Sequence, residues 1–260
     1  MSHFWLPVLT LWRREILRFV RQRSRLVGAF AQPLAFWLLL GGGFSASFRP
    51  PGAPAGSGYL EYLYPGILIL VLLFTSIFAT IAVIEDRKMG FLQGVLVAPV
   101  SRMSIVLGQA LGSTTLAVFQ GMLLLILAPF AGIHLSFGSV LATVGILFLV
   151  ALALSNLGLI IAWRMESVQG FHAIMNLILM PIWLLSGAFF PAAGLPDWFS
   201  WIMRLNPLTY GMAALRRCLY VHDQAFIGQL PHLAPSLLVM AAFAVGSFFA
   251  ATNTARRHFQ

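Results

Sequence analysis

Charged residues are scarce in this sequence. Only 9% of its 260 residues are Asp, Glu, Lys or Arg and 60% are hydrophobic, whereas soluble domains carry about 25% charged residues. The mean hydropathy is +0.90, and several apolar runs reach the roughly 20 residues that a spanning helix needs. The composition therefore excludes a soluble domain with a large core and predicts an all-α, polytopic integral membrane protein.

Cysteine and acidic residues are also few. Cys218 is the single cysteine, so the chain forms no intrachain disulfide and no cysteine metal site. The chain has 7 Asp and Glu against 16 Lys and Arg, a net charge of +9. The basic residues flank apolar runs in the positive-inside manner, so this excess is not a signature of nucleic-acid binding. The histidines are scattered, and we expect no metal site.

Motifs for nucleotide hydrolysis and for hydrolytic catalysis are missing. No phosphate-binding loop ending in Gly-Lys-Ser or Gly-Lys-Thr occurs, and the glycine run 41–43 lacks the lysine. The sequence also has no Gly-x-Ser-x-Gly, His-Glu-x-x-His or paired-carboxylate motif. We therefore expect that the chain is not an enzyme and binds no cofactor of its own.

Apolar runs predict six membrane spans within a single transmembrane domain, 1–260. No charge occurs between Arg102 and Arg164, which is too long for one helix, so a helical hairpin is predicted there with its turn near 128–134. The spans are placed at 26–44, 62–84, 104–127, 136–163, 169–190 and 235–254.

The segment 4–25 is predicted to be an amphipathic helix lying in the headgroup plane rather than a span. Arginines recur at helical spacing at 14, 18, 21 and 25. An apolar side is supplied by Trp5, Leu9, Trp12, Ile16, Phe19 and Val20. The alternative is that these arginines only set the topology.

The distribution of basic residues predicts that both termini are cytoplasmic. With the N-terminus inside, the outer side holds only Arg49, Arg204, Arg216 and Arg217, and the remaining Lys and Arg lie inside. The outer segment 191–234 is rich in Trp, Phe, Leu and Met, unlike a soluble loop. It is predicted to re-enter the outer leaflet as one or two short helices, broken by Pro196 and Pro207.

The predicted spans contain neutral polar residues but no charged ones. Intramembrane charges serve proton and sodium relays, so their absence counts against ion-coupled transport. Gln120, Asn156 and Asn176 are the polar residues with two open interpretations. Such side chains hydrogen-bond between packed helices, or they line a polar path through the protein.

The segment Glu85–Arg102 is the most informative part of the chain. It is charged and lies on the inner side between long apolar runs. Met89, Leu92 and Leu96 are predicted to share one helical face, with Pro99 stopping the helix before the next span. This apolar ridge suits a helix-in-groove anchor for a cytoplasmic partner. The alternative is a juxtamembrane helix that rests on lipid.

Two stretches of the sequence resemble the type 2 membrane subunits of ABC exporters (ABC-2 permeases), which move drugs, lipids or polysaccharides. The first stretch matches at Gly90, Leu92, Leu96, Pro99, Ser101 and Arg102. The second covers 185–191, 195–198, 206–210 and Arg216. The order of these motifs, the chain length and the predicted spans agree with that family over essentially the whole chain. Gln93 departs from the pattern, since the family often has Glu at this position.

The resemblance implies a permease that pairs with a second permease copy and with separate ATPase subunits, which bind ATP and Mg. The implied membrane is the cytoplasmic membrane of a bacterium or archaeon. The implied ATPase-coupling residues are Glu85, Asp86, Arg87, Met89, Gly90, Leu92, Leu96, Pro99 and Arg102. The implied outer gate or re-entrant segment involves Phe189, Phe190, Pro191, Pro196, Trp198, Asn206, Pro207 and Tyr210. The alternatives left open are a secondary transporter or channel without an ATPase, and a membrane-embedded enzyme.

Overall fold

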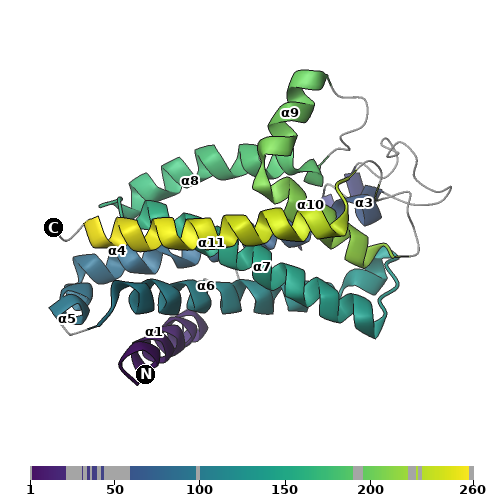
Figure 1. The fold of residues 1–260 in the computed structure, drawn as a ribbon. Coiled ribbons are helices and arrows are strands. Elements are labelled where there is room, and N and C mark those ends of the chain that lie inside the picture. Colours follow the sequence, from purple (N-terminus) through teal and green to yellow (C-terminus); the bar gives the residue numbers. More distant parts are fainter. Residues whose placement is uncertain are drawn as a thin grey trace.

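The computed structural model describes most of the chain and is helical throughout the part it describes (Figure 1). The described residues are 2–21, 31, 34, 35, 37–39, 42, 43, 59–97, 100–189, 196–221, 227 and 230–257.

Five of the helical segments are long and apolar enough to cross a membrane. They are Tyr59–Lys88 (α3, Tyr59–Ala79, with α4, Ile81–Lys88), α6 (Arg102–Leu125), α7 (Phe137–Ala162), Val168–Ala188 (α8, Val168–Trp183, with η2, Leu184–Ala188) and α11 (Leu233–Arg257). These correspond to the second to sixth predicted spans. The first predicted span, 26–44, falls largely outside the described residues, so the sixth crossing stays a prediction. Within it, the Trp37 indole N–H donates to the carbonyl of Leu60 at 3.3 Å, which places Trp37 against α3.

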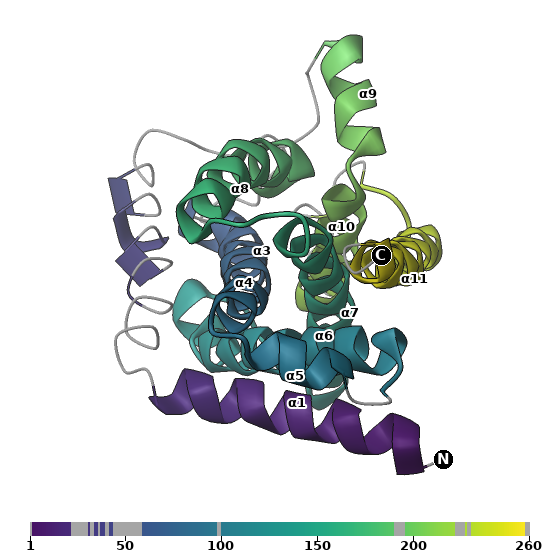
Figure 2. The same cartoon turned by 90° about the vertical axis from the view of Figure 1, so that its left-hand side faces the viewer.

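The helix α3 forms the centre of the bundle, and α6, α7, α8 and α10 pack around it (Figure 2). Nearly every side chain of α3 is buried, which explains why its sequence is apolar on all sides. Just after its C-terminal end, the Thr80 hydroxyl donates to the Ile77 carbonyl at 2.6 Å. Gly158 of α7 lies directly against Thr80, where an added Cβ would come within 2.9 Å of the hydroxyl oxygen. The small residue therefore allows α7 to approach at the junction between α3 and α4.

The predicted hairpin between α6 and α7 is confirmed. The turn is a short 3-10 helix, η1 (Ala128–Ala131), followed by Gly132 at a φ of 83°. A positive φ at this position favours glycine. Ser136 then caps α7, where its hydroxyl accepts from the Ser139 N–H at 3.2 Å.

The predicted break of the outer segment at its two prolines is also confirmed. The helix α9 (Asp197–Leu205) begins after Pro196, and α10 (Pro207–Leu219) begins at Pro207. The α10 helix packs against α3, α7 and α11, whereas α9 projects from the bundle (Figure 1). The α9 residue Trp198 is 64% exposed. Its insertion into a membrane leaflet stays a prediction.

The N-terminal helix α1 (Ser2–Arg21) lies across α6 (Figure 2). The side chains that it buries are those of Val8, Leu11, Glu15 and Phe19. Among the six residues that were predicted to form the apolar side of this helix, only Phe19 is buried against the protein. Trp5, Leu9 and Val20 are exposed instead, as an apolar face in contact with lipid requires. The helix therefore has one face on the protein and a second apolar face turned outward.

Candidate functional site

The charged segment between the first two described spans is more helical than predicted. Glu85–Lys88 are not loop residues but the last turn of α4, and the separate helix α5 covers Phe91–Val97. The break between the two helices lies at Gly90, whose φ is 74°. No helix breaker precedes this glycine, so the spanning helix continues through the charged residues before it ends.

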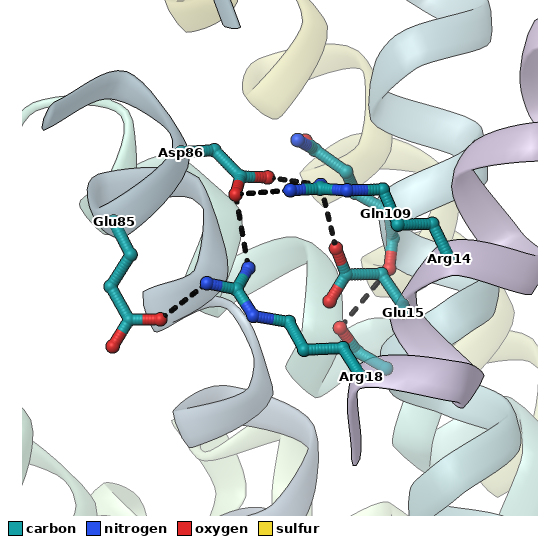
Figure 3. Close-up of polar contacts among 7 residues, drawn as sticks. Arg14, Glu15, Arg18, Glu85, Asp86 and Gln109 are labelled. Carbon is teal, nitrogen blue, oxygen red and sulfur yellow. Dashed lines mark hydrogen bonds and ion pairs between the residues drawn. The ribbon is translucent and has the colours of Figure 1, made fainter. Parts of the chain in front are cut away.

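A network of two arginines and two carboxylates joins α1 to the end of α4 (Figure 3). The guanidinium of Arg14 donates to both carboxylate oxygens of Asp86, and its Nη2–Oδ1 distance is 2.6 Å. Arg18 donates to Asp86 Oδ1 at 3.0 Å and to Glu85 Oε2 at 2.7 Å. Asp86 is only 1% exposed. Its burial is tolerated because two charged donors replace the lost water.

Glu15 adds a further negative charge beside this network. Its carboxylate lies 3.6 Å from Arg14 Nη1 (Figure 3). The hydrogen bond with Asp86 is the main reason that the pKa of Arg14 is raised above its ordinary value. Arg14 therefore remains charged at any physiological pH.

Two further contacts hold the same end of the bundle together. The Arg14 guanidinium lies 3.8 Å from the centre of the Phe91 ring, which attaches α5 to α1 by a cation–π contact. Arg87 donates to the carbonyls of Trp163, at 3.0 Å, and of Met165 in the turn between α7 and α8. The segment around α5 is thus fixed from two sides.

The predicted apolar ridge on this segment is wrong in part. Leu92 is 0% exposed and packs in the core, whereas Met89 and Phe91 are 65% and 39% exposed. Met89 cannot share a helical face with Leu92, because Gly90 separates the two helices. The side chain of Leu96 and the whole of Pro99 lie outside the described residues. Arg102 begins α6 after Ser101, whose hydroxyl accepts from the Ser104 N–H at 3.1 Å.

The three polar residues with two open interpretations separate into two groups. Gln120 accepts a hydrogen bond from Thr75 of α3, and the Asn156 amide donates to the Ala244 carbonyl of α11 at 3.1 Å. Both residues are buried and link neighbouring helices. Asn176, by contrast, is exposed on α8.

The exposed surface of α8 carries a polar stripe beside apolar side chains such as Leu177, which is 76% exposed, whereas the exposed surface of α11 is mostly apolar. Gln169, His172 and Asn176 are all exposed on α8 at positions i, i+3 and i+7, so they form one stripe. The exposed large side chains of α11 are instead those of Leu233, Leu237, Leu238, Val245 and Phe249. Between Leu233 and Ala250 every exposed residue of α11 is apolar, which is the composition that lipid tails favour.

At the opposite end of the bundle, the predicted gate residues have separate places. The Phe189 ring lies 6.2 Å from the rings of both Tyr59 and Trp183, which forms an aromatic cluster. The Asn206 amide donates to the Ile182 carbonyl at 2.7 Å, and its side-chain oxygen accepts from the Leu208 N–H and caps α10. The Tyr210 hydroxyl donates to the Arg204 carbonyl at 3.0 Å. Phe190 and Pro191 lie outside the described residues.

The distribution of basic residues predicts that Arg216 lies on the outer side of the membrane, but the structure buries its side chain. It is 3% exposed, and its guanidinium lies 4.1 Å from the centre of the Tyr62 ring. It donates at 3.1 Å to the carbonyl of Gly187, whose φ of 80° kinks the chain within η2. Arg216 therefore ties α10 to both α3 and the end of α8.

Sequence reasoning missed the network between α1 and α4. The arginines were interpreted as headgroup contacts or topology signals, although Arg14 and Arg18 are four residues apart and share one helical side. The pair Glu85–Asp86 at the end of a long apolar run was the available signal, because such carboxylates need a countercharge. Among the described residues, no group of three or more His, Cys, Asp or Glu side chains is arranged to hold a metal ion.

The apolar helices define a multi-pass membrane protein. The sequence profile of the ABC-2 type transporter matches residues 7–220, so the chain belongs to the ABC-2 type transporter family. Similar proteins include a ycf38 protein of Cyanophora paradoxa whose name describes a transport permease. It is 31% identical over 226 residues, covering 85% of this chain and 77% of its own. The ycf38 protein of Porphyra purpurea is 28% identical, covering 79% and 71%. Nodulation protein J of Rhizobium meliloti is 26% identical, covering 96% and 92%.

Proposed function

We propose that this chain is the permease subunit of an ATP-driven ABC exporter and supplies half of the translocation pathway. A second permease copy supplies the other half, and separate ATPase subunits bind ATP and Mg. The proposed location is the cytoplasmic membrane of a bacterium or archaeon, with both termini in the cytoplasm. The segment Glu85–Arg102 is the proposed contact with the ATPase.

One observation carries the coupling proposal: a short helix is held firmly at one end of the bundle while apolar side chains beside it point outward. Met89, which follows α4, and Phe91, which begins α5, are exposed. The charged network on Asp86 fixes the end of α4 beside them. An exposed apolar anchor on a rigid base suits insertion into a groove of another protein. A force applied to α5 then reaches α1 through Arg14 and the turn between α7 and α8 through Arg87.

Replacing Met89 with Asp is expected to weaken ATPase binding about 30-fold, because a charge would enter a desolvated apolar contact. The measurement is co-purification of this chain with a co-expressed ABC ATPase, followed by titration of the complex. Leu205→Asp on α9, away from α5, is the control, since Leu205 is 78% exposed and gains the same charge. Equal binding by the two variants would remove Met89 from the interface. Failure of the unaltered chain to bind any ATPase would favour a secondary transporter or channel.

The polar stripe on α8 supports a second part of the proposal, the position of the pathway. A spanning helix that faced lipid with Gln169, His172 and Asn176 would leave their polar groups without partners in hydrocarbon. We propose that this face of α8 lines a water-filled path formed with the second permease copy. The apolar face of α11 is then the surface in contact with lipid.

Cysteine labelling tests the position of this path without knowledge of the substrate. In a Cys218→Ser background, Asn176→Cys is expected to react with a water-soluble maleimide at least about tenfold faster than Leu238→Cys, because only a thiol in water ionises readily. Leu238 is 71% exposed on α11 and serves as the matched position. Labelling of both positions at one rate would contradict the assignment of α8 to an aqueous path.

A further inference from the structure

An open groove lies beside α1 at the end of the bundle that carries α5. Its volume is about 550 Å³. Its lining includes Arg13, Arg14, Arg18 and Arg21 of α1, together with Leu17 and Met89. The side chains of four arginines from one helix thus line a single depression.

The groove keeps an excess of positive charge after its internal ion pairs are counted. Arg14 and Arg18 are engaged with Asp86 and Glu85. Arg13 and Arg21 are exposed, and within the described part of the chain neither one forms an ion pair with a carboxylate. These two arginines are therefore available to an anion from outside the protein.

The position of the groove on α1 indicates which anion it takes. Leu17 lines the groove and is 45% exposed, and Leu6 and Leu9, on the same outward side of α1, are 69% and 55% exposed. The outward apolar face of the helix therefore runs directly into the groove. An apolar face next to arginines is the arrangement found where a helix lies at the boundary between acyl chains and headgroups.

We propose that this groove binds the phosphate headgroup of an anionic phospholipid. Arg13 and Arg21 contact the phosphate, and the acyl chains lie along Leu6, Leu9 and Leu17. The competing occupant is an acidic segment of the ATPase, since Met89 borders the same groove. The lipid is favoured because the apolar face extends along α1 beyond the groove, to Leu6 and Leu9, neither of which lines it. This proposal is independent of the coupling mechanism.

The test uses the full chain in detergent and measures its affinity for phosphatidylglycerol and phosphatidylcholine by native mass spectrometry. The variant Arg13→Gln with Arg21→Gln is expected to bind phosphatidylglycerol roughly 10- to 30-fold more weakly, because each arginine near the headgroups contributes about 1 kcal/mol. Its affinity for phosphatidylcholine is expected to stay the same. Both arginines are exposed, so the variant is expected to unfold at the same temperature as the unaltered chain.

A second pair of arginines provides the matched control. Arg164 and Arg257 line another depression, between α7 and α11, and their replacement by Gln removes the same charge. Full retention of phosphatidylglycerol by this control is expected.

An equal loss in both double variants, or a loss in neither, would refute a specific site at Arg13 and Arg21. Displacement of the lipid by millimolar inorganic phosphate would assign the groove to free phosphate. If the Arg13 and Arg21 variant kept the lipid but lost the ATPase in co-purification, the occupant would be the acidic protein segment.

Discussion

Asp86→Ala is expected to lower the free energy of unfolding by about 3 kcal/mol. Removing one partner of a buried ion pair costs roughly 3–5 kcal/mol, and the lower end applies because the side chains of Arg14 and Arg18 remain 28% and 18% exposed. Without the Asp86 carboxylate, the two guanidinium groups at the end of α4 lose the buried acceptor that they share, and only the outlying carboxylates of Glu15 and Glu85 remain beside them. The measurement is unfolding of the purified chain in detergent by heat and by denaturant.

The neighbouring carboxylate supplies the control for this result. Glu85 has a 32% exposed side chain and receives one hydrogen bond from Arg18, so Glu85→Ala is expected to cost only about 0.5–1 kcal/mol. In a double-mutant cycle, Arg14→Ala is expected to cost little once Asp86 is already Ala, since the two residues act as a pair. Additive losses in that cycle, or equal losses for Asp86→Ala and Glu85→Ala, would show that the network does not hold α1 to α4.

Replacing Gly108 and Gly112 with Val is expected to detach α1 from α6 and to cost about 4 kcal/mol. An added Cβ at Gly108 would come within 2.9 Å of the Leu11 Cβ and of the Val8 carbonyl oxygen. At Gly112 it would come within 2.7 Å of the Glu15 Cβ. Overpacking at one such position costs roughly 1–3 kcal/mol. The contacting atoms here are backbone or Cβ atoms, which cannot move aside as the end of a flexible side chain can. The expected readouts are a lower unfolding temperature and proteolytic cleavage within α1.

Gly145 gives a matched test of glycine replacement in an apolar helix of the same bundle. It lies within α7, and nothing stands within 4 Å of an added Cβ. Gly145→Ala is therefore expected to stabilise the protein by about 0.5–1 kcal/mol, as Ala does in place of Gly inside a helix. If Gly108→Val with Gly112→Val unfolded at the same temperature as Gly145→Ala, the close contact between α1 and α6 would be refuted.

The second to sixth spans were predictable because they depend only on the lengths of apolar runs. The hairpin near Gly132 and the breaks at Pro196 and Pro207 followed from residues that set the local backbone. The pairing of Arg14 with Asp86 was not predictable in this way, because it joins residues 72 positions apart and no periodicity encodes the partner. For the same reason the sequence alone left open whether Gln120 or Asn176 faced another helix.

The burial of Leu92 marks a second limit. A period of 3.6 residues identifies a face of a helix but not the direction in which that face turns. Gly90, with its positive φ, changes the chain direction just before α5 and decides this orientation. A continuous helix from Met89 onward would place Leu92 on the face that contacts the partner, whereas the structure buries Leu92 in the core.

The break at the end of α8 has a consequence for the shape of the proposed path. Gly187 has a φ of 80° within η2 (Leu184–Ala188), so the regular helix that carries the polar stripe ends there. At that level the rings of Tyr59, Trp183 and Phe189 gather. The proposed path then has two unlike parts: polar side chains line the section before the break, and aromatic rings border the other, where Arg216 donates to the Gly187 carbonyl.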